Sequence, residues 1–252
     1  MSGGSDATTS DQINVLGDHL GRELIRLDWQ GEGFKMSFAH DIPFADGSGM
    51  GLQNFPDGVN TLHFSFDRRD RWVTDLLYEF VYTKCQSGDR HDRPATPEEL
   101  EQHPDRPVIV MGGRDSYFNN GEYRSAWTYF GRTIGIPLFT PMPVNADGMT
   151  YGVANNRLVA HHVGIGGQIA HCVPYRLKAT YSVSDVPYGS VLPVMETKPK
   201  QLSVGFEVSS PLLGKHFPVA VSMGVYGDYG ELYLNNYGLT LKLGWGGTAF
   251  HK

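Results

Sequence analysis

The feature of this sequence that most constrains its fold is a two-residue alternation of apolar and polar side chains, which recurs in about eight segments. In one of them, Phe34, Met36 and Phe38 alternate with Lys35 and Ser37. Successive side chains of a β-strand point to opposite faces, so each segment is expected to form a strand with one apolar and one polar face. The sequence therefore predicts an all-β fold.

The connections between the predicted strands alternate between tight turns and long loops. Those after the first, third, fifth and seventh strands span only a few residues, and those after the second, fourth and sixth are long and rich in Gly, Pro, Asn, Asp and Tyr. This arrangement is typical of an antiparallel up-and-down outer-membrane β-barrel with long surface loops, because only those loops are free to grow. We predict strands at about residues 22–29, 34–44, 60–67, 72–84, 156–166, 175–184, 201–209, 217–226 and 233–245.

One connection, residues 85–154, is far longer than ordinary loops. Loops of that length are usually functional or form a small subdomain. Within this insertion, residues 96–102 predict a short helix capped by Thr96. The predicted organisation is a flexible N-terminus at residues 1–13 followed by a barrel portion at residues 14–252, with the insertion as a surface loop.

Composition limits the partners of the chain. Its 252 residues are 40% apolar, which is enough for a packed core, and the net charge of −6 with no Lys/Arg-rich block excludes a nucleic-acid footprint. No apolar run approaches the ~18 residues of a membrane-spanning helix, so contact with membrane lipid would require strands. Because the connections follow the pattern of an outer-membrane barrel, we expect the cell outer membrane as the location, with outer-membrane lipid as one partner.

The start of the chain lacks the charged and apolar segments of a signal peptide. A barrel needs such a signal to reach the outer membrane, so we expect either a removed presequence or a longer protein of which this is the C-terminal part. Cys85 and Cys172 fall at opposite ends of the predicted wall and are not expected to pair.

Residues 115–135, read as Asp-Ser-Tyr-Phe-Asn-Asn-Gly-Glu-Tyr-Arg-Ser-Ala-Trp-Thr-Tyr-Phe-Gly-Arg-Thr-Ile-Gly, resemble the signature loop of the capsule assembly Wzi family of Bacteroidetes-type bacteria. Residues 14–21, 46–50 and 155–166 agree with that family in the same order. The resemblance implies a non-enzymatic outer-membrane barrel of about eighteen strands that binds or organises capsular polysaccharide at the cell surface. This chain would supply about eight or nine of those strands, and a missing N-terminal half is then a possible partner.

The same loop gathers the groups that a sugar needs. Aromatic rings can stack on the apolar face of a sugar, and carboxylate, amide and guanidinium groups can bind its hydroxyls. The alternative is that the aromatic residues form the core of the loop itself, and the sequence leaves both uses open. The candidate polysaccharide-binding residues are Asp115, Tyr117, Asn119, Asn120, Tyr123, Trp127 and Arg132.

Other chemistries find little support in the sequence. His161 and His162 are neighbours on a predicted strand, so they point to opposite faces and cannot share a metal ion. Asp75 and Glu79 lie ~13 Å apart along a strand, beyond the carboxyl separation of glycosidases unless the side chains converge. We expect no catalytic residues, metal or cofactor. The alternative function is a soluble all-β carbohydrate-active enzyme or carbohydrate-binding module, with the apolar strand faces packed in a sandwich core.

Overall fold

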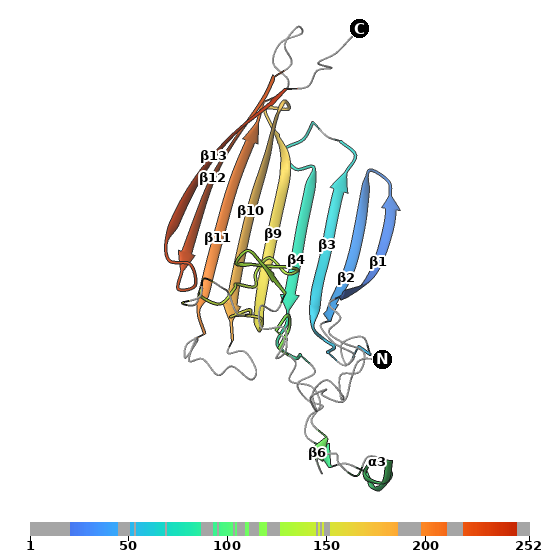
Figure 1. Cartoon of the computed structure of the whole chain (residues 1–252). Coiled ribbons are helices and arrows are strands. Elements are labelled where there is room, and N and C mark those ends of the chain that lie inside the picture. The colour runs from blue at the N-terminus through green and yellow to red at the C-terminus, as the bar shows by residue number, and fades with distance from the viewer. Residues whose placement is uncertain are drawn as a thin grey trace, which may run out of the picture.

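A computed structural model of the chain is shown in Figure 1. It describes residues 21–44, 51–52, 54–68, 70–86, 93–94, 96–102, 104, 109–110, 116–119, 127–144, 146, 148, 152–185, 198–210 and 219–245. The predicted N-terminal segment 1–13, the motif segments 14–20 and 46–50 and the turn at 211–216 lie outside these residues.

The described residues form one large antiparallel sheet of nine strands in chain order (Figure 1). This confirms the prediction of an antiparallel all-β fold. The strands are β1 (Gly21–Gly31), β2 (Phe34–Phe44), β3 (Gly58–Phe66), β4 (Asp75–Tyr82), β9 (Leu158–Ile169), β10 (Val173–Ser184), β11 (Lys200–Ser209), β12 (Val219–Gly230) and β13 (Asn236–Trp245).

The insertion between β4 and β9 contains the remaining elements. A short helix, α3 (Pro97–Gln102), lies where it was predicted, and the backbone N–H of Leu100 donates to the carbonyl of Thr96. The helix lies in the chain between the paired strands β5 (Arg93–Pro94) and β6 (Ile109–Val110), and a second pair, β7 (Thr128–Tyr129) with β8 (Arg132–Thr133), follows. No helix within the described ranges is both long and apolar enough to cross a membrane.

Tight turns and long connections separate to opposite ends of the sheet, as predicted. The β1–β2, β3–β4 and β9–β10 turns share one end, where the Nδ1 atom of His171 lies 2.7 Å from the carbonyl oxygen of Asp70. The β2–β3 loop and the insertion share the other end, at which α3 and β6 lie in Figure 1. Cys85 and Cys172 are both free, the first at the start of the insertion and the second in the β9–β10 turn.

One strand was predicted wrongly. The segment 72–84 was expected to be the longest strand, but β4 begins at Asp75 and has only eight residues. The chain bends before it, and the carbonyl of Trp72 accepts a hydrogen bond from the Tyr175 hydroxyl at 2.6 Å. The aromatic and apolar pattern therefore extends beyond the residues that pair as a strand.

The register of the sheet keeps each side-chain type on one face over all nine strands. Residues that pair across strands share a face, and neighbouring rows therefore have opposite character. One row is apolar and aromatic: Leu27, Phe38, Leu62, Tyr78, Val163, Ala179, Val204, Gly227 and Tyr237. The next row is almost entirely polar: Arg26, Ala39, Thr61, Glu79, His162, Thr180, Ser203, Asp228 and Asn236.

The apolar face is exposed along the sheet. Tyr237 is 77% exposed and Leu239 is 71% exposed, and Ile25, Leu27 and Trp29 on β1 are also more than half exposed. No second sheet among the described elements covers this face.

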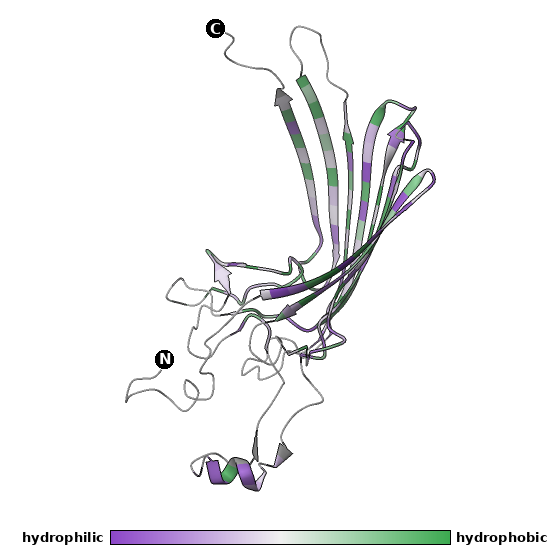
Figure 2. Ribbon diagram, turned by 90° about the vertical axis from the view of Figure 1, so that its right-hand side faces the viewer, coloured by the Kyte–Doolittle hydropathy of each residue, from purple (hydrophilic) through white to green (hydrophobic). Residues whose placement is uncertain are grey.

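The buried core lies on the other face, at the long-loop end. Val81 of β4 and Ala160 of β9 face the same side as the polar row and are buried there. Phe118 and Phe139 of the insertion belong to the same cluster. Figure 2 shows the curved sheet from the side, with the connections of this end lying to one side of it. Val81 therefore provides an apolar contact on the polar face, against which the insertion packs.

The sheet is open within the described residues. Its order begins at β1 and ends at β13, and no pairing joins these two strands. Closure into a barrel and contact with the outer membrane therefore stay predictions.

Gly166 and Gly167 are adjacent in β9, so a side chain added to each would point to opposite faces of the sheet. Substituting them tests which residues of β9 lie on which face. A Cβ on Gly167 would collide with the backbone carbonyl of Trp72, whereas a Cβ on Gly166 would meet the Cβ of Asp75 at 3.5 Å, an ordinary contact. We expect Gly167→Ala to destabilise the protein by about 1–3 kcal/mol. We expect Gly166→Ala to leave stability equal or slightly higher. Thermal unfolding followed by circular dichroism measures both, and equal melting temperatures of the two variants would contradict the assignment.

Candidate functional site

The structure places four of the seven predicted sugar-binding residues. Asp115, Asn120 and Tyr123 lie outside the described residues. The other four are Tyr117, Asn119, Trp127 and Arg132, which fall into a buried group and an exposed group.

Tyr117 and Asn119 hold the insertion in place. Tyr117 is 1% exposed, and its hydroxyl donates to Oδ2 of Asp57 at 2.8 Å. The side-chain amide of Asn119 bonds both backbone groups of Val153, donating to the carbonyl at 3.0 Å and accepting from the N–H at 2.7 Å. Trp127 packs half-buried against the same core. This placement favours a bracing role for Tyr117 and Asn119, and sugar contact by them stays a prediction.

Arg132 belongs to an exposed hairpin, the β7–β8 hairpin. Tyr129 and Phe130 at its tip are 67% and 87% exposed, and their rings meet edge to face with centroids 4.5 Å apart. Phe130 and Gly131 have φ values of 45° and 70°, which is the pattern of a type I′ turn. A bulky aromatic residue in the left-handed region is strained, and such strain often marks a functional position.

The importance of Phe130 was missed in the sequence. The motif was recognised as a whole, but periodicity does not reveal which aromatic residues of a loop are exposed. The one available signal was Gly131, because glycine favours the second position of a type I′ turn and so points to Tyr129 and Arg132 as a facing pair.

Asp57 anchors the insertion at its base. Its carboxylate accepts from the backbone N–H groups of Cys85 at 2.8 Å and Gln86 at 2.7 Å, besides the Tyr117 hydroxyl. Asp57 is fully buried, and this burial raises its pKa to about 6 although the three hydrogen bonds and the nearby Arg157 oppose the shift. Nothing in the sequence singled out this aspartate.

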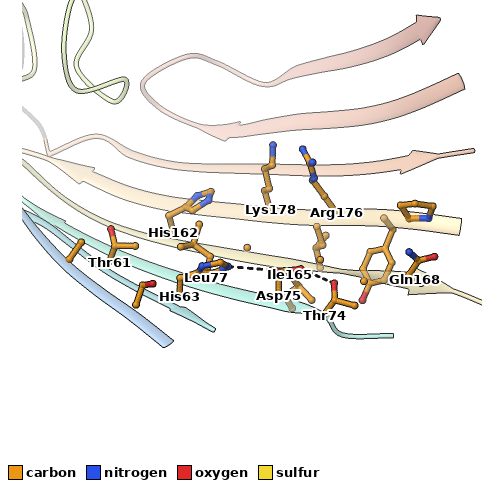
Figure 3. A pocket seen from close by; sticks show the side chains of 18 of the residues that line it. Thr61, His63, Thr74, Asp75, Leu77, His162, Ile165, Gln168, Arg176 and Lys178 are labelled. Atoms are coloured by element: carbon orange, nitrogen blue, oxygen red, sulfur yellow. Dashed lines mark hydrogen bonds and ion pairs between the residues drawn. The ribbon is translucent and has the colours of Figure 1, made fainter. Parts of the chain in front are cut away.

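A hollow of about 730 Å³ lies on the polar face between β1 and β10 (Figure 3). The Nε2 atom of His63 lies 3.5 Å from Oδ1 of Asp75, and the Thr74 hydroxyl donates to Oδ2 of Asp75 at 2.8 Å. Nδ1 of His162 lies 2.6 Å from the Thr180 hydroxyl oxygen. Further polar residues of the lining are Arg26, Ser37, Thr61, Gln168, Tyr175, Arg176 and Lys178.

The structure confirms that the paired histidines face apart. His162 lines the hollow on the polar face, and His161 lies on the apolar face with Nδ1 2.8 Å from the Tyr78 hydroxyl. Within the described part of the chain, no group of three or more His, Cys, Asp or Glu side chains could hold a metal ion. Of the two carboxylates weighed as a pair, Glu79 accepts from the Thr61 hydroxyl at 3.2 Å.

A second hollow, of about 610 Å³, separates the polar face from the insertion. Phe118 and the segment 135–138 form its insertion side, and Val59 and Val81 lie on its sheet side. Its lining is more apolar than that of the first hollow and offers a sugar fewer polar partners.

Comparison with known proteins adds no identification. No family model matches the chain, and neither curated proteins nor solved structures give a significant match.

The bracing and the exposed residues of the insertion are separable by mutation. We expect Asn119→Ala to lower the free energy of unfolding by about 1–3 kcal/mol, because the backbone groups of Val153 lose their partners. We expect Arg132→Ala to leave stability unchanged, because its side chain is exposed. Chemical unfolding in detergent micelles measures both, and a larger loss for Arg132→Ala would refute the division.

The buried Asp57 predicts a pH dependence of stability. Between about pH 4 and pH 6 its carboxyl is ionised in the unfolded chain but largely protonated in the native protein, so the native state binds more protons. Stability should therefore fall as the pH rises through this window, by at most about 3 kcal/mol, and then level off. Unfolding midpoints from pH 4 to 7 test this: Asp57→Asn should flatten the slope, and an equal slope in both proteins would contradict it.

Proposed function

We propose that this chain forms part of the wall of an outer-membrane β-barrel that binds or organises capsular polysaccharide and is not an enzyme. The observation that carries the proposal is the uncovered apolar face that continues over nine strands. Removing one large apolar side chain from water gains about 1.5–3 kcal/mol, so a face of this extent strongly favours a lipid contact. Soluble monomers rarely expose apolar patches above a few hundred Å².

The opposite face supports a lumen. Its row from Arg26 to Asn236 is polar in nearly every strand, as expected for a surface that meets water inside a barrel. The insertion packs on this face at the long-loop end, where Phe118 belongs to the same buried cluster as Val81. Both edges of the sheet are unpaired in the described residues, so the proposal includes further strands, such as those of an N-terminal half, that complete a barrel of about eighteen.

The polysaccharide part of the proposal rests on chemistry and resemblance. The β7–β8 hairpin presents two aromatic rings and a guanidinium group, which together suit the apolar face and the hydroxyls of a sugar. Residues 115–135, which include this hairpin, are those that resemble the Wzi family.

A soluble carbohydrate-active protein would place the apolar face against a second layer. Tyr78, Tyr181 and Leu239 are instead exposed, and no described element lies over them. The non-enzymatic part of the proposal has its own test: purified protein should release no reducing sugar from capsular polysaccharide. Hydrolysis that is lost in Asp75→Asn or Glu79→Gln would refute it.

The membrane and sugar parts can be tested on the same variants. We expect the protein to enter detergent micelles as a heat-modifiable species, and Leu239→Asp to impair this. We expect Arg132→Ala to weaken binding of capsular polysaccharide about 10- to 100-fold, since a charged hydrogen bond contributes ~1.5–3 kcal/mol. We expect Phe130→Ala to weaken it about 3- to 10-fold, since an aromatic contact contributes ~0.5–1.5 kcal/mol. The control is Thr128→Ala, which lies on the same hairpin away from its tip.

Each result has a contrary outcome. A protein that stays fully in the aqueous phase would refute the membrane assignment. Wild-type binding by correctly folded Arg132→Ala would rule out that side chain as a ligand contact, and unchanged binding in both tip variants would refute the hairpin as the sugar site.

A further inference from the structure

The hollow on the polar face crosses a stretch of β9 that carries no side chains on that face. Gly164 and Gly166 both lie there, between Leu77 and Asp75 on β4 and Lys178 and Arg176 on β10. Adjacent strands are about 4.8 Å apart, so the two flanking strands are about 10 Å apart across the glycines. We call this strip, with Asp75, Arg176 and Lys178 as its walls, the glycine trough.

The side chains of Leu77 and Asp75 border the floor of the trough: a Cβ on Gly164 would meet the Cβ of Leu77 at 3.3 Å, and one on Gly166 would have Oδ2 of Asp75 3.8 Å away. A Cβ on Gly166 would meet only ordinary contacts, the nearest being the Cβ of Asp75 at 3.5 Å. On the same face, Gly205 and Gly224 differ, because the ring and hydroxyl of Tyr226 occupy the space above them. A glycine in the interior of a strand lowers stability, and the pair on β9 lines the hollow with no aromatic ring above it.

The two walls of the trough differ in charge. On β10, Arg176 is exposed and makes no hydrogen bond or ion pair within the described residues, while Lys178 lies 3.3 Å from Glu207. On β4, Asp75 is already engaged by His63 and Thr74. Figure 3 shows Arg176 and Lys178 side by side on β10, and the Asp75–His63 contact between β4 and β3 on the other side of β9. The cation available to a ligand is therefore Arg176.

We propose that the glycine trough binds an acidic saccharide, with a sugar carboxylate on Arg176 and the ring over Gly164 and Gly166. This inference rests on the proposed function, because it names the chemical class of the polysaccharide. The planar guanidinium fork of arginine matches a carboxylate with two parallel hydrogen bonds. Asp75 borders the ring position on the β4 side, where His63 and Thr74 already engage its carboxylate, whereas the sugar carboxylate would lie on the β10 side.

The test measures binding of two short oligosaccharides to the full chain in detergent micelles by calorimetry. Trigalacturonate carries carboxylates and maltotriose carries none. We expect the wild-type protein to bind trigalacturonate at least 10-fold more tightly than maltotriose, and this preference to shrink as salt is added. Arg176→Gln should lower the affinity for trigalacturonate about 10-fold, and Gly166→Val, which fills the floor, should weaken both ligands.

Matched controls lie on the same face outside the hollow. Lys242→Gln removes one cation from β13, and Gly244→Ala adds a methyl group where the nearest atom would be 3.8 Å away. Both should bind like the wild type. Heat-modifiability checks that each variant folds, and if Gly166→Val does not fold, Arg176→Gln alone decides.

Three outcomes would overturn the inference: no binding of trigalacturonate, equal affinity for the two oligosaccharides, or wild-type binding by Arg176→Gln. None of them by itself refutes the proposed function, which fails separately if the protein does not enter micelles or if capsular polysaccharide binding is insensitive to the β7–β8 hairpin.

Discussion

The strict two-residue period of nine strands, kept in one register, is the constraint on which the rest of the structure depends. A slip of a single residue between any two strands would exchange the faces of every strand beyond it. The pairing of Leu27 with Phe38 and of Arg26 with Ala39 shows how the β1–β2 turn sets the first step, with Gly33 at φ 82° allowing the tight reversal. Each later strand pair keeps the same register, so one face of the sheet carries apolar side chains and the other carries polar side chains.

Part of the insertion packs against this sheet. Val81 and Ala160 are apolar residues on the polar face at one end of the sheet, and aromatic side chains of the insertion pack against them. Asp57 then ties the β2–β3 loop to the start of the insertion through two backbone N–H groups and Tyr117. Phe130 at the hairpin tip, which is 87% exposed, is the most exposed aromatic side chain of the described part of the insertion.

Much of the sheet could be predicted from local pattern, and little of the site could. Periodicity placed β2 at its observed bounds because both faces alternate cleanly there. It overextended β4, since the bend at Trp72 is set by contact with Gly167 and Tyr175, which lie far away in sequence. The composition of residues 115–135 placed Tyr117 and Arg132 in one candidate site, because composition does not distinguish a buried ring from an exposed guanidinium group. The trough at Gly166 depends on which strands flank β9, and only the register reveals it.

The strand order has a consequence for what can complete the molecule. In an antiparallel sheet that follows chain order, successive strands reverse direction, so the first and the ninth run the same way. β1 and β13 therefore cannot close on one another with antiparallel hydrogen bonds. Two copies set side by side in the same orientation would likewise meet along parallel seams. A fully antiparallel closure requires an odd number of added strands, which makes the total even, as in bacterial outer-membrane barrels.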